Sequence, residues 1–260
     1  MATLPYLRAG QGPVLVLVHG YLGGAAQWQS EIDHFCDRFD VIAPNLPGFG
    51  AAADRPGCES ISAMAEAVHG LLDDLDLDDI ILLGHSMGGM IVQEMTRTRP
   101  ERVSKLILYG TGPLGLMPDR FEPLETSHAR LLSDGVAATI KRIGATWFLH
   151  GAKGRGYDRV TEIGAAANLH AAEAALGAMA RWDGRPALPH LTMPTLVIWG
   201  DTDRSYRWPQ IETLWSTLPD AHLAVIPHSS HAAHLEKPHL FQALITDFLS
   251  EDTRTSSGSD

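Results

Sequence analysis

Residues 80–90 read Ile80-Ile81-Leu82-Leu83-Gly84-His85-Ser86-Met87-Gly88-Gly89-Met90. The first four are apolar and two of them are β-branched, which is typical of a strand buried on both faces. Gly84, Ser86 and Gly88 then form the pattern G-x-S-x-G, and a segment with helical character follows. In such a strand–turn–helix unit the serine lies on a tight corner, with its hydroxyl at the carboxyl end of the sheet. Ser86 is therefore a candidate nucleophile, although a glycine-rich turn with a solvated serine would show the same pattern.

The composition fits a globular enzyme. The chain has 260 residues, of which 45% are hydrophobic and 20% charged, enough for one large α/β domain with an insertion. Its net charge of −11 argues against a nucleic-acid partner, and Cys36 and Cys58 form no disulfide framework. The first residues lack the features of a signal peptide, and no apolar run is long enough to span a membrane. We therefore expect a cytoplasmic monomer or homodimer that acts on a small molecule and binds no membrane.

Apolar runs alternate with helical patterns along most of the chain. Strands are expected at residues 5–8, 14–18, 41–43, 80–83, 106–109, 195–199 and 223–226. Helices are expected at 25–38, 61–75, 90–99 and 238–249, the second with Ser60 as its N-cap. This alternation predicts an α/β fold with a mostly parallel, doubly wound sheet and right-handed crossovers.

The alternation breaks between Gly110 and Pro194, where only helical patterns occur, among them an Ala-rich run over 165–179. We interpret this block as a helical cap inserted over the carboxyl ends of the strands, where such sheets bind ligands. The predicted organisation is a core over 1–112 and 191–250, a cap over 113–190 and a disordered, Ser/Thr-rich tail over 251–260.

A serine hydroxyl needs a base to remove its proton and a third group to orient that base. Asp201 and Asp203 follow the strand expected at 195–199, and three histidines follow the strand at 223–226, namely His228, His231 and His234. The order serine, acid, histidine is the one found in α/β-hydrolases, and all three loops leave the same edge of the sheet.

These segments together resemble the α/β-hydrolase superfamily, in its branch with a helical cap. The resemblance runs from about residue 14 to 249 outside the cap. It rests on His19-Gly20-Tyr21-Leu22-Gly23, Pro47-Gly48-Phe49-Gly50, the Ser86 motif, Gly200-x-x-Asp203, and His231 five residues before Glu236-Lys237-Pro238.

The resemblance implies which groups act. It selects Asp203 as the acid and leaves Asp201 to shape the turn, and it selects His231 as the base. It also implies an oxyanion hole made by the backbone N–H groups of Tyr21 and Met87. His234 is then either a packed histidine or a substrate contact. A metal site at the histidines is disfavoured because no cysteine or carboxylate completes a ligand set, and no cofactor is expected.

The cap suggests features of the substrate. Residues 113–186 carry nine Arg/Lys and eight Asp/Glu, a net +1 against −12 for the remainder. A basic cap residue such as Arg142 would suit a substrate carboxylate, although these charges also fit solvated helix faces. Trp147, Phe148 and Leu114 are candidates for an apolar roof over the substrate, or for the core of the cap.

The leading hypothesis is a cofactor-independent serine hydrolase of the carboxylesterase class, cleaving a small ester or lactone through an acyl-enzyme. The same triad also serves amidases, lyases and the C–C hydrolases of ring-cleavage products. C–C hydrolases often carry Trp soon after the catalytic histidine, whereas Ala232 and Ala233 stand here. A ligand receptor on this fold is the remote alternative outside enzymes.

Overall fold

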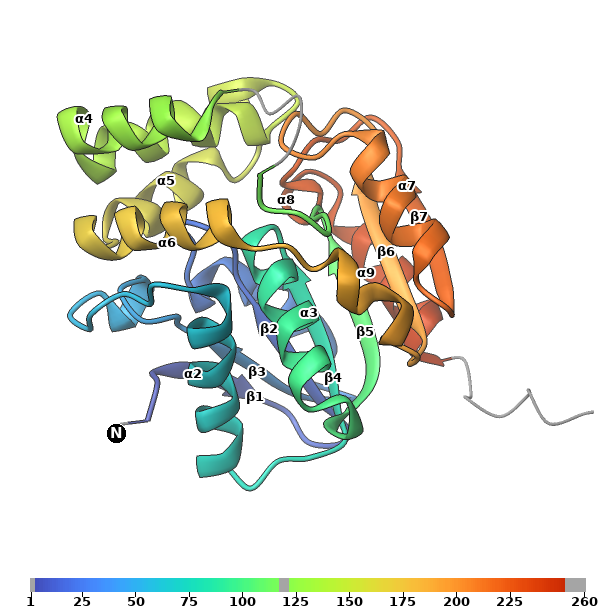
Figure 1. Cartoon of the computed structure of the whole chain (residues 1–260). Coiled ribbons are helices and arrows are strands. Elements are labelled where there is room, and N and C mark those ends of the chain that lie inside the picture. The colour runs from blue at the N-terminus through green and yellow to red at the C-terminus, as the bar shows by residue number, and fades with distance from the viewer. Residues whose placement is uncertain (1–2, 117–121, 251–260) are drawn as a thin grey trace, which may run out of the picture.

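The computed structural model describes residues 3–116 and 122–250. The tail expected to be disordered, 251–260, lies outside the described residues. Seven strands form one sheet in the order β1-β3-β2-β4-β5-β6-β7, with β1 antiparallel to β3 and the other pairs parallel (Figure 1). The strands are β1 (Tyr6–Ala9), β2 (Val14–Val18), β3 (Asp40–Pro44), β4 (Ile80–His85), β5 (Val103–Tyr109), β6 (Thr195–Gly200) and β7 (Ala221–Ile226). The expected mostly parallel α/β fold is confirmed.

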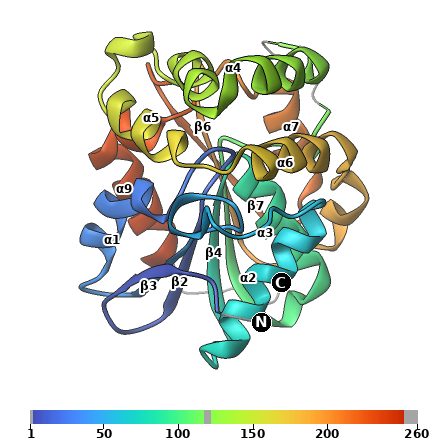
Figure 2. The ribbon, with the colours of Figure 1, turned by 90° about the vertical axis from the view of Figure 1, so that its left-hand side faces the viewer.

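Helices cover both faces of this sheet, as the strand sequences require. Along β2, Val14, Val16 and Val18 join one hydrophobic core, and Leu15 and Leu17 join the other. The first core includes α2 (Ile61–Asp74), α3 (Met87–Thr98) and α7 (Trp208–Thr217). The second includes α1 (Gln29–Phe35), α8 (Ala233–Glu236) and α9 (Pro238–Ser250). Figure 2 shows α1 and α9 on one side of the sheet and α2 and α3 on the other.

Several helix boundaries differ from the expectation. The helix expected at 25–38 begins as a 3-10 turn (Ala25–Trp28) and continues as α1 only to Phe35. The Ala-rich run is divided because Asn168 caps a new helix, its side chain accepting hydrogen bonds from the N–H groups of His170 and Ala171. Helix α7 was not expected, because only Ile211 and Leu214 give it a buried apolar stripe.

Three helices between β5 and β6 lie across the end of the sheet where the parallel strands terminate (Figures 1 and 2). They are α4 (Leu124–Gly144), α5 (Tyr157–Ala165) and α6 (Leu169–Arg181), and Gly135 kinks α4 with a φ of 77°. Backbone bonds tie this block to the loops beneath it. Asn168 N–H donates to the Gly48 carbonyl at 2.9 Å, and Ala232 N–H donates to the Trp147 carbonyl at 2.9 Å.

None of the helices within 3–116 and 122–250 combines the length and the apolar character that crossing a membrane requires.

Candidate active site

Ser86 occupies the corner between β4 and α3 with φ 56° and ψ −119°, a conformation that side-chain-bearing residues rarely adopt. Only glycine fits on either side of it. A Cβ on Gly84 would lie 2.3 Å from the Gly88 carbonyl oxygen, and one on Gly88 would lie 2.2 Å from the Val18 carbonyl oxygen. The backbone segments thus pass close enough to force the strained turn at Ser86, which is half-buried.

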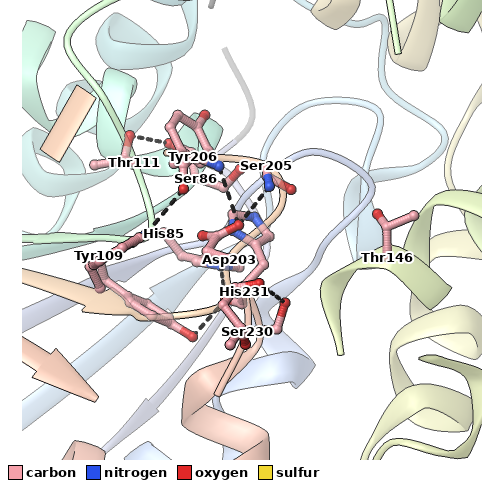
Figure 3. Close-up of polar contacts among 12 residues, drawn as sticks. His85, Ser86, Tyr109, Thr111, Thr146, Asp203, Ser205, Tyr206, Ser230 and His231 are labelled. Carbon is pink, nitrogen blue, oxygen red and sulfur yellow. Dashed lines mark hydrogen bonds and ion pairs between the residues drawn. The ribbon is translucent and has the colours of Figure 1, made fainter. Parts of the chain in front are cut away.

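Hydrogen bonds from β5 and the loop after it fix the Ser86 backbone. Its N–H donates to the Tyr109 carbonyl at 3.0 Å, and Thr111 Oγ1 donates to its carbonyl oxygen at 2.7 Å (Figure 3). Both peptide groups of the strained residue are therefore held, which offsets part of the cost of its conformation.

Asp203 and His231 form a buried pair. His231 Nδ1 lies 2.8 Å from Asp203 Oδ2, and each residue is only 2% exposed (Figure 3). The other carboxylate oxygen, Oδ1, accepts the backbone N–H groups of Ser205 at 2.7 Å and Tyr206 at 3.2 Å. Because an ionised carboxylate only accepts, it fixes the proton of His231 on Nδ1 and leaves Nε2 as the acceptor.

The neighbouring candidates occupy different environments. Asp201 is exposed, and its carboxylate accepts the Ser229 N–H at 3.3 Å, so it shapes the turn between two loops. His228 is exposed with a φ of 54°, whereas His234 is 2% exposed and lies among aromatic rings.

Three aromatic rings surround the His231 imidazole. Tyr206 is stacked on it, with ring centroids 5.6 Å apart and an interplanar angle of 19°. Trp147 and His85 lie at centroid distances of 5.9 Å and 4.6 Å. Sequence reasoning missed Tyr206, since nothing in its spacing distinguishes it from a loop residue.

His85 contacts the backbone of the loop that carries His231. Burial, followed by repulsion from His231 and His234, lowers its pKa well below 6.5, so the ring is neutral. Its Nε2 lies 3.1 Å from the His231 carbonyl oxygen, which can only accept, so His85 donates there. Its ring stacks on Tyr109 at 4.5 Å.

The loop after β2 is held by His19. Its Nε2 accepts the Leu46 N–H at 3.1 Å, so the ring proton is on Nδ1, which donates to the Gly20 carbonyl at 2.8 Å. Burial lowers the pKa of His19 to about 4 and keeps it neutral. The Gly23 N–H donates to the same carbonyl at 3.1 Å. The Gly20 carbonyl therefore points toward the interior of the loop that follows β2, where both of its donors lie.

The residues expected to contact substrate are dispersed. Trp147 lies beside His231, but its neighbour Phe148 is fully buried against Tyr157 in the helical block, and its ring is not among the side chains that line the small cavity near His231. Leu114 is half-buried and forms an isolated bridge with Asp183.

The expected carboxylate partner Arg142 is engaged within the protein through Nη1, whereas its Nε and Nη2 are buried and have no hydrogen-bond partner in the described part of the chain. Its Nη1 binds Glu122 at 3.0 Å, and Arg130 binds the same carboxylate at 2.6 Å. Arg159 donates to the Ala26 carbonyl at 2.8 Å. Among the described residues, no group of three or more His, Cys, Asp and Glu side chains could hold a metal ion.

The parallel sheet, the serine corner and the adjacent Asp–His pair define a hydrolase of the α/β type. A family model described as the alpha/beta hydrolase fold matches residues 13–142, and the chain belongs to this family.

The relatives include esterases and a dienoate hydrolase. The chain is 28% identical to the pimeloyl-[acyl-carrier protein] methyl ester esterase of Aeromonas hydrophila, covering 93% of this chain and 97% of that protein. It is 31% identical to the 2-hydroxy-6-oxo-6-phenylhexa-2,4-dienoate hydrolase of Burkholderia cepacia, covering 93% and 89%. Among solved structures, a thermophilic esterase from Thermogutta terrifontis superposes with a TM-score of 0.85 at 29% identity, covering 95% and 92%. The family is thus shared, while the bond that is cleaved differs among its members.

Proposed function

We propose that this protein is a cofactor-independent serine hydrolase that cleaves a small ester or lactone. The observation that carries the proposal is the buried 2.8 Å contact between His231 and Asp203, beside the strained corner that presents Ser86. His231 Nε2 removes the hydroxyl proton as Ser86 Oγ attacks the carbonyl carbon, and it returns that proton to the departing alcohol. Water, deprotonated by the same nitrogen, then cleaves the acyl-enzyme and regenerates Ser86.

The backbone supports an oxyanion hole at Tyr21 and Met87. The peptide between Gly20 and Tyr21 is trans, so its N–H points opposite to the inward-turned Gly20 carbonyl. A Cβ on Gly20 would lie 3.0 Å from the Ser86 Cβ, and this close approach to Ser86 supports the assignment. Met87 is the first residue of α3, where unpaired N–H groups and the helix dipole favour negative charge. Each such donor typically contributes about 10²–10³ in kcat.

The surroundings favour an uncharged reacting group. Trp147 and Tyr206 flank the base, and Arg142 and Arg130 are already paired with Glu122. The helices α4–α6 serve in this proposal as the cap that bounds the substrate site.

The test is hydrolysis of p-nitrophenyl esters from acetate to decanoate by the wild type, Ser86→Ala and Ser216→Ala. Ser216 is an exposed serine on α7 and serves as the matched control. We expect turnover of short esters by the wild type and the control, and a loss of at least about 10³-fold in Ser86→Ala.

Failure on every ester would contradict the esterase assignment. If a fluorophosphonate then still labelled Ser86, ring-cleavage dienones would be the next substrates, as the name of the Burkholderia cepacia relative suggests.

A further inference from the structure

A small cavity near the proposed catalytic groups is lined by two side chains that each carry a buried polar atom without a hydrogen-bond partner. Its volume is about 20 Å³, and its wall is largely apolar, with Leu22, Val160 and Ile163 contributing from the loop after β2 and from α5. Within the described part of the chain, His234 Nε2 and Gln27 Nε2 are both buried and have no hydrogen-bond partner. Both side chains line this cavity. Such atoms cost free energy unless something binds them.

The tautomer of His234 follows from its bonds to Tyr109. The Tyr109 hydroxyl lies 2.8 Å from the His231 carbonyl oxygen, 3.1 Å from the His234 backbone N and 3.0 Å from His234 Nδ1. A carbonyl only accepts, so the hydroxyl donates its single proton there and accepts from both His234 groups. His234 Nδ1 therefore carries the ring proton, and Nε2 presents a bare lone pair.

The charge state of His234 agrees with this assignment. Burial lowers the pKa of His234 to about 3, with a further contribution from His231, so the ring is neutral at physiological pH. A second proton on Nε2 is therefore not available to bind an anion.

Gln27 contributes the opposite polarity. It lies in the 3-10 turn Ala25–Trp28, and its side-chain NH₂ can only donate. A donor and an acceptor thus line one cavity with room for about one oxygen atom. A hydroxyl group satisfies both, since it accepts from Gln27 and donates to His234. A carboxylate would face the lone pair of His234, and an ammonium would face the donor of Gln27.

Two of the residues that line the cavity, His85 and Trp147, also contact the His231 ring. Three of its lining residues are chain neighbours of the proposed machinery: His85 precedes Ser86, Leu22 follows Tyr21, and Ala232 follows His231. Trp147, which lies 5.9 Å from the His231 ring, forms part of the same wall.

We infer that Gln27 and His234 form a subsite for a neutral hydroxyl group of the substrate, which makes the preferred substrate a hydroxylated ester or lactone. This inference rests on the proposed function, because the hydroxyl would belong to the substrate whose ester group Ser86 attacks. When no substrate is bound, a water molecule can make the same two hydrogen bonds.

The test compares methyl butyrate with the methyl esters of 2-, 3- and 4-hydroxybutyrate. For the wild type we expect kcat/KM to be at least about 10-fold higher for one hydroxy ester than for methyl butyrate, because a site built to bind a hydroxyl rejects the analogue without it. Gln27→Leu should reduce this ratio to near 1. Gln29→Leu, which alters an exposed glutamine two residues further on, should leave the ratio unchanged.

A binding measurement separates this inference from the proposed function. In Ser86→Ala, calorimetry should show at least about 10-fold tighter binding of the same hydroxy ester than of methyl butyrate. Equal Kd values for all four esters would show that the cavity holds only water and would overturn the inference, even if the wild type hydrolyses every ester. A hydroxyl preference in binding without any turnover by the wild type would instead contradict the proposed function and leave the subsite supported.

Discussion

The imidazole of His231 is constrained along one edge and on its faces. Asp203 binds Nδ1, Tyr206 stacks on the ring, and the His231 carbonyl accepts from His85 and Tyr109. A general base in this mechanism must present one nitrogen in one tautomer at a fixed position. Single substitutions around the ring should therefore affect kcat more than KM.

Asp203→Asn should lower kcat by on the order of 10³–10⁴, because the amide no longer fixes the proton of His231 on Nδ1. Asp201→Asn is the matched control, since Asp201 lies two residues away and its carboxylate accepts only the Ser229 N–H among the described residues. Steady-state kinetics on p-nitrophenyl acetate measures both. Equal losses in the two variants would remove Asp203 from its assigned role.

Tyr206→Leu should lower kcat by roughly 3–10-fold, because the aromatic face no longer stabilises the imidazolium that forms during acyl transfer. Tyr206→Phe keeps the stacked ring and should retain most of the activity. Stopped-flow measurement of the acylation rate distinguishes the two. If Phe and Leu lowered the rate equally, stacking would not be the contribution that Tyr206 makes.

At the scale of an element, the β4–Ser86–α3 unit depends on close backbone approach. A Cβ on Gly88 would lie 2.2 Å from the Val18 carbonyl oxygen, whereas a Cβ on Gly70, exposed in the middle of α2, would contact nothing within 4 Å. A side chain would therefore clash with the backbone at Gly88 and would be tolerated at Gly70.

Gly88→Ala should lower the free energy of unfolding by about 1–3 kcal/mol or more through overpacking. Gly70→Ala should raise it by about 0.5–1 kcal/mol, because Ala is the better helix former and nothing obstructs it. Urea unfolding followed by circular dichroism gives both values. A neutral Gly88→Ala would mean that β2 and α3 can separate at low cost.

Helix α1 carries a buried acid that the proposed mechanism does not use. Glu31 is fully buried, and burial raises its pKa from 4.5 to about 8. The native state then keeps a proton that the unfolded chain releases above pH 4.5. The free energy of unfolding therefore falls as pH rises from about 4.5 to 8, by up to about 1.4 kcal/mol per pH unit.

Glu31→Gln should remove this dependence, so its stability relative to the wild type should grow between pH 5 and pH 8. Thermal unfolding at pH 5, 6.5 and 8 measures the difference, with exposed Glu212→Gln on α7 as the control. Parallel pH curves for Glu31→Gln and the wild type would show that Glu31 is ionised in the native protein.

At the scale of the whole molecule, the sequence predicts the features that depend on neighbouring residues, namely the strands and the helix caps. Apolar runs predict all seven strands, and Ser60 as an N-cap predicts the start of α2, where its side chain accepts the Ala63 N–H. Loop positions after β4, β6 and β7 offer Ser86, two aspartates and three histidines as candidates, because carboxyl ends of parallel strands share one edge. The resemblance to the α/β-hydrolase superfamily then selects Asp203 and His231.

Contacts between distant segments could not be predicted in this way. Trp147 and Phe148 are adjacent in sequence, yet one lies beside His231 and the other packs within the helical block, because a 3-10 turn ends at Trp147. The pairing of Arg142 with Glu122 depends on the kink at Gly135, because a straight helix α4 would hold Arg142 far from the residues that precede the helix. The Gln27–His234 cavity likewise forms only when segments far apart in the sequence come together, because its wall combines residues from 22–27, 85, 147, 160–163 and 232–234.

The most direct test of the central claim, that Ser86 is the nucleophile of an Asp203–His231-assisted acyl transfer, is to trap the acyl-enzyme. The wild type would be acid-quenched during turnover of p-nitrophenyl acetate, digested and mapped by mass spectrometry. We predict one acetyl group on the peptide that contains Ser86, absent from Ser86→Ala and present in Ser216→Ala. Turnover by Ser86→Ala at the wild-type rate, or an acetyl group on another residue that forms and decays at the rate of turnover, would contradict the account.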